Sequence, residues 1–360
     1  MNEGSGGEAF DGGWQGPLEG RQLVLLAALL LGLPVLILAL ARIHPQATRQ
    51  WDLSLPWSLN EFHTQNALRF AAAAQAASEG RVRITVHPGA ALGVKGPDSL
   101  RAAADGVVPL VEMAGFQQVG SEPILGLEAL PFLVDDAAEL KLLYRFLRPQ
   151  VDAAFARHGL KVLYLVPWPN QNLYTKTRVD NLAALAGVKI RTQDANTTAL
   201  MARLGLSPVQ MPAPDVVPAL ASGAVSATIT SATTAAAQKY WAFLRYIYRT
   251  NHVWISNMLV VNLTAWNRLA AADRLAIERL ARTMEPEFWA VSAGDDTRQM
   301  ARLLSEGMIV AGPSPAMAAE MRAAARPLWR DFAARVPAAR PILDAYLAAT
   351  GRAPLDEPRP

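Results

Sequence analysis

The sequence has no cysteine among its 360 residues. Disulfides, thiolate metal sites and a cysteine nucleophile are therefore excluded, and so is a bacterial lipoprotein anchor, which requires a lipidated cysteine. The five histidines are scattered without the spacing of metal ligands. Basic residues form no block, and the formal net charge is only +3, so neither a bound metal nor a nucleic-acid partner is expected.

Motifs of the common catalytic classes are missing as well. Residues 87–96 form a glycine-containing loop, but it lacks the Gly-Lys-Ser/Thr ending of a phosphate-binding loop. The sequence has no His-Glu-x-x-His motif and no nucleophile elbow. Glu112 and Asp194 could form an acid/base pair across a cleft, although two polar residues that only line a binding cleft would look the same. These absences favour a binding protein without a cofactor over an enzyme.

The N-terminal part of the chain differs from the rest. Residues 1–20 are rich in glycine and acidic residues and are expected to be disordered. Residues 22–41 form a continuous apolar run that is long enough to span a bilayer. Ala39-Leu40-Ala41 also fits the small-x-small pattern of a signal-peptide cleavage site. We expect residues 21–42 to be an export signal, cleaved or kept as an inner-membrane anchor, and the following chain to be periplasmic.

From Trp51 onward, the patterns of strand and helix alternate, which is typical of an α/β protein, and the chain length favours two domains. Strands are expected at residues 52–59, 81–86, 160–166, 252–262 and 308–310. Helices are expected at residues 66–78, 136–147, 314–334 and 340–349, with a long helical segment that begins near residue 264.

One stretch of the sequence is repeated at a distance. Residues 97–113 and 214–230 align without a gap, begin with Pro-Asp and reach a glycine, Gly106 or Gly223, at the same offset. In each copy we expect the aspartate to cap a short helix and the glycine to end it. Each copy then enters an apolar strand. The repeat predicts two similarly built lobes.

Residues 187–194 are the most informative stretch. Val188 and Ile190 alternate with charged residues, as in a half-buried strand, and residues 198–204 are predicted to form the next helix. Arg191 therefore lies where a strand ends and a helix begins, and ligands collect at such strand ends in open α/β sheets. Its planar guanidinium can hold a carboxylate by two hydrogen bonds. The alternative is a solvated arginine at the end of a strand.

Several short motifs occur in a recognisable order, among them residues 80–86 (GRVRITV), 104–106 (ADG), 130–132 (LPF) and 185–191 (LAGVKIR). Over about residues 52–350 the chain resembles the solute-binding proteins of tripartite ATP-independent periplasmic (TRAP) transporters, the DctP-like family. The resemblance implies an α/β periplasmic-binding-protein fold with two lobes, two strand crossovers and a long helix spanning both lobes. It also implies capture of a solute by closure of the cleft.

The resemblance further implies how the chain is divided and which residues bind the solute. Lobe I is expected to comprise residues 52–169 and 256–297, and lobe II residues 170–255 and 298–350. The carboxylate-binding arginine of the family falls on Arg191. The other implied ligand residues are Asp194, Asn172, Trp168, Thr230, Ser231, Glu112 and Met113. Supporting or surface roles are the alternatives for these residues, and for Trp168 packing between the lobes.

The function implied is that of an extracytoplasmic receptor. It would capture a small organic acid, as a monomer, and deliver it to TRAP integral membrane subunits. The second basic residue that some relatives carry is absent near Asn172, whereas the carboxylate-binding arginine is present as Arg191. A membrane-anchored ligand-sensing domain of the same fold is the alternative, and neighbouring genes for TRAP membrane subunits or for a kinase or cyclase would distinguish the two.

Overall fold

The computed structural model describes residues 48–356. The predictions of disorder for residues 1–20 and of an export signal or anchor for residues 21–42 concern residues outside this range. Among the described helices, none combines the length and the apolarity that crossing a bilayer requires.

Strands and helices alternate along the described chain. The strands are β1 (Arg49–Ser54), β2 (Val82–His87), β3 (Leu110–Ala114), β4 (Leu160–Pro167), β5 (Asn172–Thr175), β6 (Lys189–Thr192), β7 (Ser207–Gln210), β8 (Ala227–Thr230), β9 (Tyr246–Tyr248), β10 (Ser256–Asn262) and β11 (Ile309–Ala311). The α-helices are α2 (Phe62–Ala77), α3 (Ser99–Ala104), α4 (Ala137–Arg157), α5 (Ala195–Arg203), α6 (Val216–Ala221), α7 (Ala232–Ala237), α8 (Leu263–Asn267), α9 (Ala271–Ser305), α10 (Pro315–Arg335) and α11 (Ala339–Ala349).

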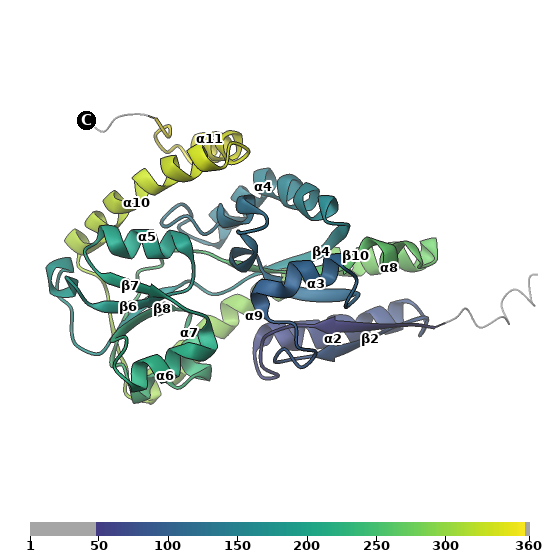
Figure 1. Ribbon diagram of the computed structural model, residues 1–360, viewed down its shortest axis with the longest axis horizontal. Coiled ribbons are helices and arrows are strands. Elements are labelled where there is room, and N and C mark those ends of the chain that lie inside the picture. The colour runs from purple at the N-terminus through teal and green to yellow at the C-terminus, as the bar shows by residue number, and fades with distance from the viewer. Residues whose placement is uncertain (1–47, 357–360) are drawn as a thin grey trace, which may run out of the picture. The chain divides into compact units, whose positions relative to one another are not determined.

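The strands form two sheets, one in each of two lobes, which confirms the predicted fold class. Lobe I contains a five-stranded sheet in the order β2-β1-β3-β10-β4, and lobe II a six-stranded sheet in the order β11-β9-β5-β8-β6-β7. In lobe I, α2 and α9 pack on one face of the sheet and α3 and α4 on the other. In lobe II, α5 and α10 cover one face and α6 and α7 the other (Figure 1). Helices on both faces explain why a central strand such as β10 is buried along its whole length.

The two sheets repeat one topology, as the sequence repeat predicts. Parallel strands pair in the order β2-β1-β3 in lobe I and β7-β6-β8 in lobe II. α3 and α6 occupy equivalent places, and each is followed by a glycine with positive φ, +71° at Gly106 and +74° at Gly223. The predicted helix caps are wrong, because Asp98 and Asp215 have helical rather than extended backbones and accept no capping hydrogen bond.

One antiparallel strand in each sheet arrives from the other lobe. β10 enters lobe I after the chain has passed through lobe II, and it pairs with β3 and β4. β5 enters lobe II from lobe I and pairs with β8 and β9. Residues 168–171 and 249–255 therefore connect the lobes. The strand predicted at residues 252–262 is shorter, because its first residues belong to this connection, where His252 O accepts a hydrogen bond from Phe132 N (2.7 Å).

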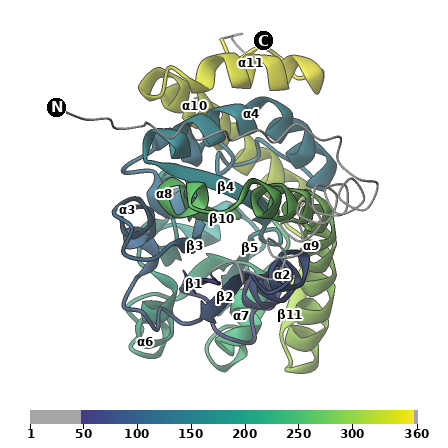
Figure 2. The same cartoon turned by 90° about the vertical axis from the view of Figure 1, so that its right-hand side faces the viewer.

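α9 is the long helix that the resemblance implies. Its 35 residues extend over about 52 Å at 1.5 Å per residue. Trp289 Nε1 donates to Leu165 O in lobe I (2.8 Å), and Asp295 accepts from Thr233 Oγ1 in lobe II (2.6 Å). Figure 2 shows α9 running beside α2. The helical segment predicted from near residue 264 is two helices, since α8 ends before α9 begins.

Two elements differ in length from the sequence-based expectation. The pattern predicts a helix that ends at Leu147, but α4 continues through Pro149. A proline inside a helix costs about 3 kcal/mol. Val151 and Phe155 extend the buried face beyond it, and burying two such side chains contributes about as much or more. β1 ends before residue 59 because Pro56 has no N–H to donate to a neighbouring strand.

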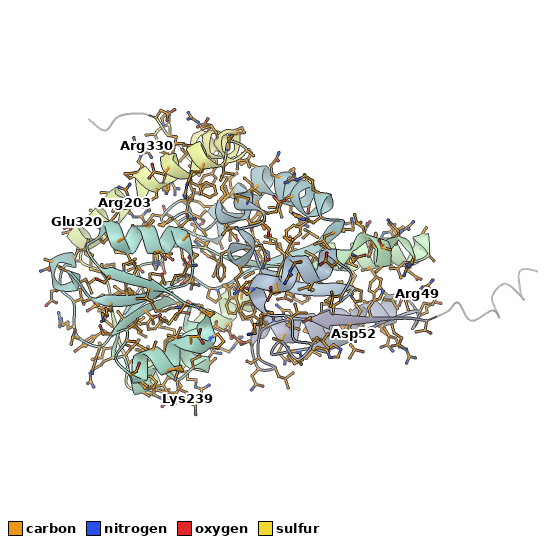
Figure 3. All side chains as sticks on the ribbon, in the orientation of Figure 1. Arg49, Asp52, Arg203, Lys239, Glu320 and Arg330 are labelled. Carbon is orange, nitrogen blue, oxygen red and sulfur yellow. The ribbon has the colours of Figure 1, made fainter. Side chains whose placement is uncertain are left out.

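α10 packs against both lobes, and α11 packs against lobe I. Met317 at the start of α10 joins the core of lobe II, whereas Phe332 near its end joins the core of lobe I. α11 packs on α4, as Figure 1 also shows. Arg203, labelled in Figure 3, connects the end of α5 to Asp331 of α10 with 3.3 Å between Nη2 and Oδ2. The assignment of residues 298–350 to lobe II, like the rest of the lobe division, stays a prediction.

Candidate functional site

A cavity of about 440 Å³ lies between the two lobes and is lined by side chains from both. Most of the lining residues lie at or just beyond the carboxyl ends of β1, β3, β4, β6, β7 and β8, where ligands collect in α/β sheets. Among them are Trp57, Phe116 and Trp168 from lobe I and Arg191, Thr230 and Ser231 from lobe II. We call this space the interlobe cavity.

Arg191 lies in the wall of the interlobe cavity and is only 4% exposed. Its guanidinium is held by two backbone carbonyls, with Nε donating to Met211 O (3.0 Å) and Nη1 donating to Ile229 O (3.1 Å). These carbonyls belong to the ends of β7 and β8, on either side of β6, so the sheet itself orients the side chain. The alternative of a solvated strand-end arginine is therefore wrong.

The charge of Arg191 has no counter-ion in the described part of the chain, since no carboxylate of residues 48–356 forms an ion pair with it. Burial lowers the pKa of the guanidinium, and the nearby Tyr240 and Asp194 offset the shift only in part. Arginine nevertheless stays protonated. The interlobe cavity therefore contains a buried, unpaired positive charge, which is costly until an anion joins it.

Asp194 caps the helix that follows Arg191. Its backbone is extended, and its carboxylate accepts hydrogen bonds from Thr197 N (2.9 Å) and Thr197 Oγ1 (2.7 Å). α5 therefore begins at Ala195, earlier than the predicted residue 198. Burial raises the pKa of the Asp194 carboxyl, and the hydrogen bonds from Thr197 and the charge of Arg191 oppose this shift.

Asp194 does not line the interlobe cavity with Arg191. It lines a second cavity of about 270 Å³, together with Asn196 and Phe332. The alternation of the extended chain explains this, because Thr192 and Asp194 face α5 whereas Arg191 faces the interlobe cavity. A contact between Asp194 and the solute stays a prediction.

The cap gives Asp194 a measurable effect on stability. Asp194→Ala is expected to lower the free energy of unfolding by about 1 kcal/mol, because α5 loses the acceptor for its first free N–H groups. Asp194→Asn should restore most of this loss, since asparagine is an equally good cap. Urea denaturation of the three proteins without added solute measures the effect. Equal stability of wild type and Asp194→Ala would show that the cap contributes nothing.

Three more predicted site residues, Trp168, Thr230 and Ser231, line the interlobe cavity. Ser231 also caps α7, with its Oγ accepting from Thr234 N (3.3 Å). The indole ring of Trp168 stands edge-on to Trp57, with 4.9 Å between ring centroids. Trp168 therefore packs within an aromatic cluster and faces the cavity at the same time.

Asn172 and Met113 are predicted site residues that the structure does not bring to the cavity wall. Asn172 lies opposite Thr230 in the pairing of β5 with β8, and its side chain is buried. Met113 is fully buried in the core of lobe I. Ligand roles for both residues stay predictions.

Glu112 lies behind the aromatic wall of the cavity and is fully buried. Its carboxylate accepts hydrogen bonds from Tyr164 OH (3.1 Å) and Asn257 Nδ2 (3.0 Å). Asn257 Oδ1 in turn accepts from Trp168 Nε1 (2.7 Å). Glu112 is thus connected to the cavity through Asn257 and Trp168. It forms no acid/base pair with Asp194 there, because neither side chain lines the interlobe cavity.

Gln193, Trp57 and Phe116 also line the interlobe cavity but are not among the predicted site residues. A signal for each was present. Gln193 comes two residues after Arg191, which places both on the same side of an extended chain. Trp57 and Phe116 follow the carboxyl ends of β1 and β3, which is the edge of an α/β sheet where ligands bind.

Comparison with known proteins assigns the chain to a family. Residues 53–335 match the DctP family model, described as bacterial extracellular solute-binding protein, family 7. Among curated proteins, an uncharacterized protein of Haemophilus influenzae is 20% identical over 213 residues. That match covers 59% of this chain and 65% of the Haemophilus protein, so the chain matches just under two thirds of this curated relative's length.

Solved structures of TRAP receptors are similar over nearly their whole length. DctP7 of Bordetella pertussis, an extracytoplasmic solute receptor that binds pyroglutamic acid, is 27% identical with a TM-score of 0.80, covering 83% of this chain and 99% of that one. A marine metagenome TRAP solute-binding protein specific for pyroglutamate is 30% identical with a TM-score of 0.78, covering 84% and 99%. This chain belongs to the DctP family of bacterial extracellular solute-binding proteins, the receptors of TRAP transporters.

Proposed function

We infer that the protein is the extracytoplasmic receptor of a TRAP transporter and that it binds a small monocarboxylate in the interlobe cavity. The observation that carries this proposal is the environment of Arg191. Its guanidinium is buried, fixed by Met211 O and Ile229 O, and without an acidic partner in the described chain. A carboxylate is the group that best complements such a planar cation.

The free end of the guanidinium supports this choice. Nη2 of Arg191 donates to no described residue, whereas Nε and Nη1 are already engaged by the sheet. A carboxylate at this end would neutralise the buried charge without disturbing the two carbonyl contacts. A cavity of about 440 Å³ is at the small end of the range for ligand sites, which favours a compact acid.

The two solved receptors described above, each more than 25% identical to this chain, both bind pyroglutamate, a compact monocarboxylate. Pyroglutamate is therefore the first solute to test with this protein. We further propose that the lobes close on the solute by motion at residues 168–171 and 249–255, since hinge motions are absorbed at the ends of elements. The closed receptor would then deliver the acid to TRAP membrane subunits.

Pyroglutamate is expected to raise the melting temperature of the purified protein. At 100 times its Kd, a solute that binds only the folded state stabilises it by about 2.7 kcal/mol, which corresponds to roughly 5 °C for a chain of this size. The same protein should release a small carboxylic acid on denaturation, identifiable by mass spectrometry.

The control is 2-pyrrolidinone, which has the ring of pyroglutamate but no carboxylate and should leave the melting temperature unchanged. If neither pyroglutamate nor any of a panel of small carboxylates shifts the melting temperature, and no acid is released, the proposal of a carboxylate receptor is refuted.

A further inference from the structure

Gln193 is a buried amide without a hydrogen-bond partner in the part of the chain that the structure describes. The residue is 9% exposed, and both Oε1 and Nε2 are buried without a hydrogen bond to any described residue. An unsatisfied polar group in such a place costs roughly 1–3 kcal/mol, so each one needs an explanation. Gln193 lines the interlobe cavity, where a bound solute would supply the missing partner.

The extended chain sets the position of Gln193 relative to Arg191. Thr192 and Asp194 turn toward α5, where they bond with Thr198 and Thr197. Arg191 and Gln193 alternate with them and both line the interlobe cavity. Residues two apart on a strand have Cα atoms about 7 Å apart. One compact molecule can therefore contact the guanidinium and the amide at once.

We propose that Gln193 selects carboxylates that carry a cis-amide, such as a lactam. This proposal rests on the proposed function, in which Arg191 holds the carboxylate. A primary amide presents one donor and one acceptor side by side, and a lactam presents an N–H and a C=O on one edge in the same way. The two edges can form a pair of hydrogen bonds that satisfies both polar atoms of Gln193. An open-chain amide is trans and presents its N–H and C=O on opposite edges, so it cannot form this pair.

The selection would follow from the cost of the unpaired amide. A solute without the lactam edge fills the cavity, expels water and leaves both polar atoms of Gln193 without partners. Sites that are built to bond a polar group strongly reject analogues that lack it, whereas a missing methylene changes affinity far less. The lactam, rather than the ring size, is then the feature that the receptor recognises.

Titration calorimetry with three probes tests this selection. Wild type is expected to bind pyroglutamate about 100-fold more tightly than cyclopentanecarboxylate, which has the same ring size and carboxylate but no amide. N-acetylglycine, a carboxylate with a trans amide, should bind as weakly as cyclopentanecarboxylate. In Gln193→Met, which keeps the side-chain length without the amide, the preference for pyroglutamate should shrink to within about 5-fold.

Two further variants make the result interpretable. Gln193→Asn keeps the amide but withdraws it by one methylene, so it should also lose the preference for pyroglutamate. This variant tests the proposal even if Gln193→Met does not fold. Gln75→Met, the same substitution on the exposed surface of α2, should leave the preference intact.

The outcomes separate this inference from the proposed function. A preference that persists in Gln193→Met, or equal affinities of wild type for pyroglutamate and cyclopentanecarboxylate, would overturn the role of Gln193 while the carboxylate site stands. If wild type binds none of the three acids, the selection of lactams by Gln193 is refuted, and the wider panel of carboxylates decides whether the carboxylate site stands.

Discussion

Replacing Arg191 with alanine is expected to weaken the binding of pyroglutamate by roughly 2–5 kcal/mol, or about 30-fold to several thousand-fold in Kd. The expected loss is large because the solute carboxylate would be buried without Arg191, the only cationic side chain among the described residues that line the cavity. Titration calorimetry on wild type and variant measures it directly.

The affinity of Arg191→Lys for pyroglutamate should lie between the affinities of wild type and Arg191→Ala. Lysine keeps the charge, but its compact ammonium cannot contact Met211 O, Ile229 O and a carboxylate in the geometry of the planar guanidinium. Because alanine leaves these two carbonyls without the arginine, the melting temperature of each unliganded variant must be measured as well. Arg203→Ala, which removes an exposed arginine on α5, is the matched control and should bind as wild type does. Wild-type affinity in Arg191→Ala would end the hypothesis of a carboxylate clamp.

Raising the pH from about 5 to about 8 is expected to lower the free energy of unfolding by about 3 kcal/mol through Glu128 alone. Burial raises the pKa of this carboxyl from 4.5 to about 7, although Tyr144 OH (2.7 Å) and Ser256 N and Oγ (both 2.8 Å) donate hydrogen bonds to it. Between pH 4.5 and 7 the folded protein keeps a proton that the unfolded chain has lost. The stabilisation is therefore complete below pH 4.5 and is lost as the pH rises through 7.

Urea denaturation of wild type and Glu128→Gln at pH 5 and pH 8 isolates this contribution. The variant keeps the shape of the side chain and removes its titration, so its stability should depend less on pH than that of wild type by about 3 kcal/mol over the interval. The two proteins should differ most at pH 8, where wild type contains a buried carboxylate. Parallel pH dependences would show that Glu128 titrates normally.

Arg191 could be placed from the sequence because its position depends on local signals. A short alternating segment, a helix after it and the rule for strand ends put the guanidinium at the ligand edge of a sheet. The repeat of residues 97–113 in residues 214–230 predicted two similar lobes, and the equivalent strand orders β2-β1-β3 and β7-β6-β8 confirm it. Gln193 could have been predicted in the same way, because residues two apart in an extended chain face the same side and Gln193 comes two residues after Arg191.

Glu112 and Met113 could not be placed from the sequence. β3 is buried on both faces, so its pattern does not distinguish a side that faces a cavity from a side that faces the core. The surroundings of Glu112 depend on β10, because Asn257 of β10 bonds to Glu112 although it lies 145 residues after it in the sequence. Contacts over such distances have no local signal. The same reason applies to α10, whose two ends join different lobes.

β10 lies in the middle of the lobe I sheet, between β3 and β4, although the chain reaches it only after five of the six strands of lobe II. A chain delivered from its N-terminus would therefore first form lobe I with two strand edges, those of β3 and β4, exposed to solvent. Such edges are sites for pairing with other chains, and pairing over long sequence separations is slow. The lobe I sheet cannot be completed before β10 arrives, so most of lobe II emerges while the N-terminal lobe is still incomplete.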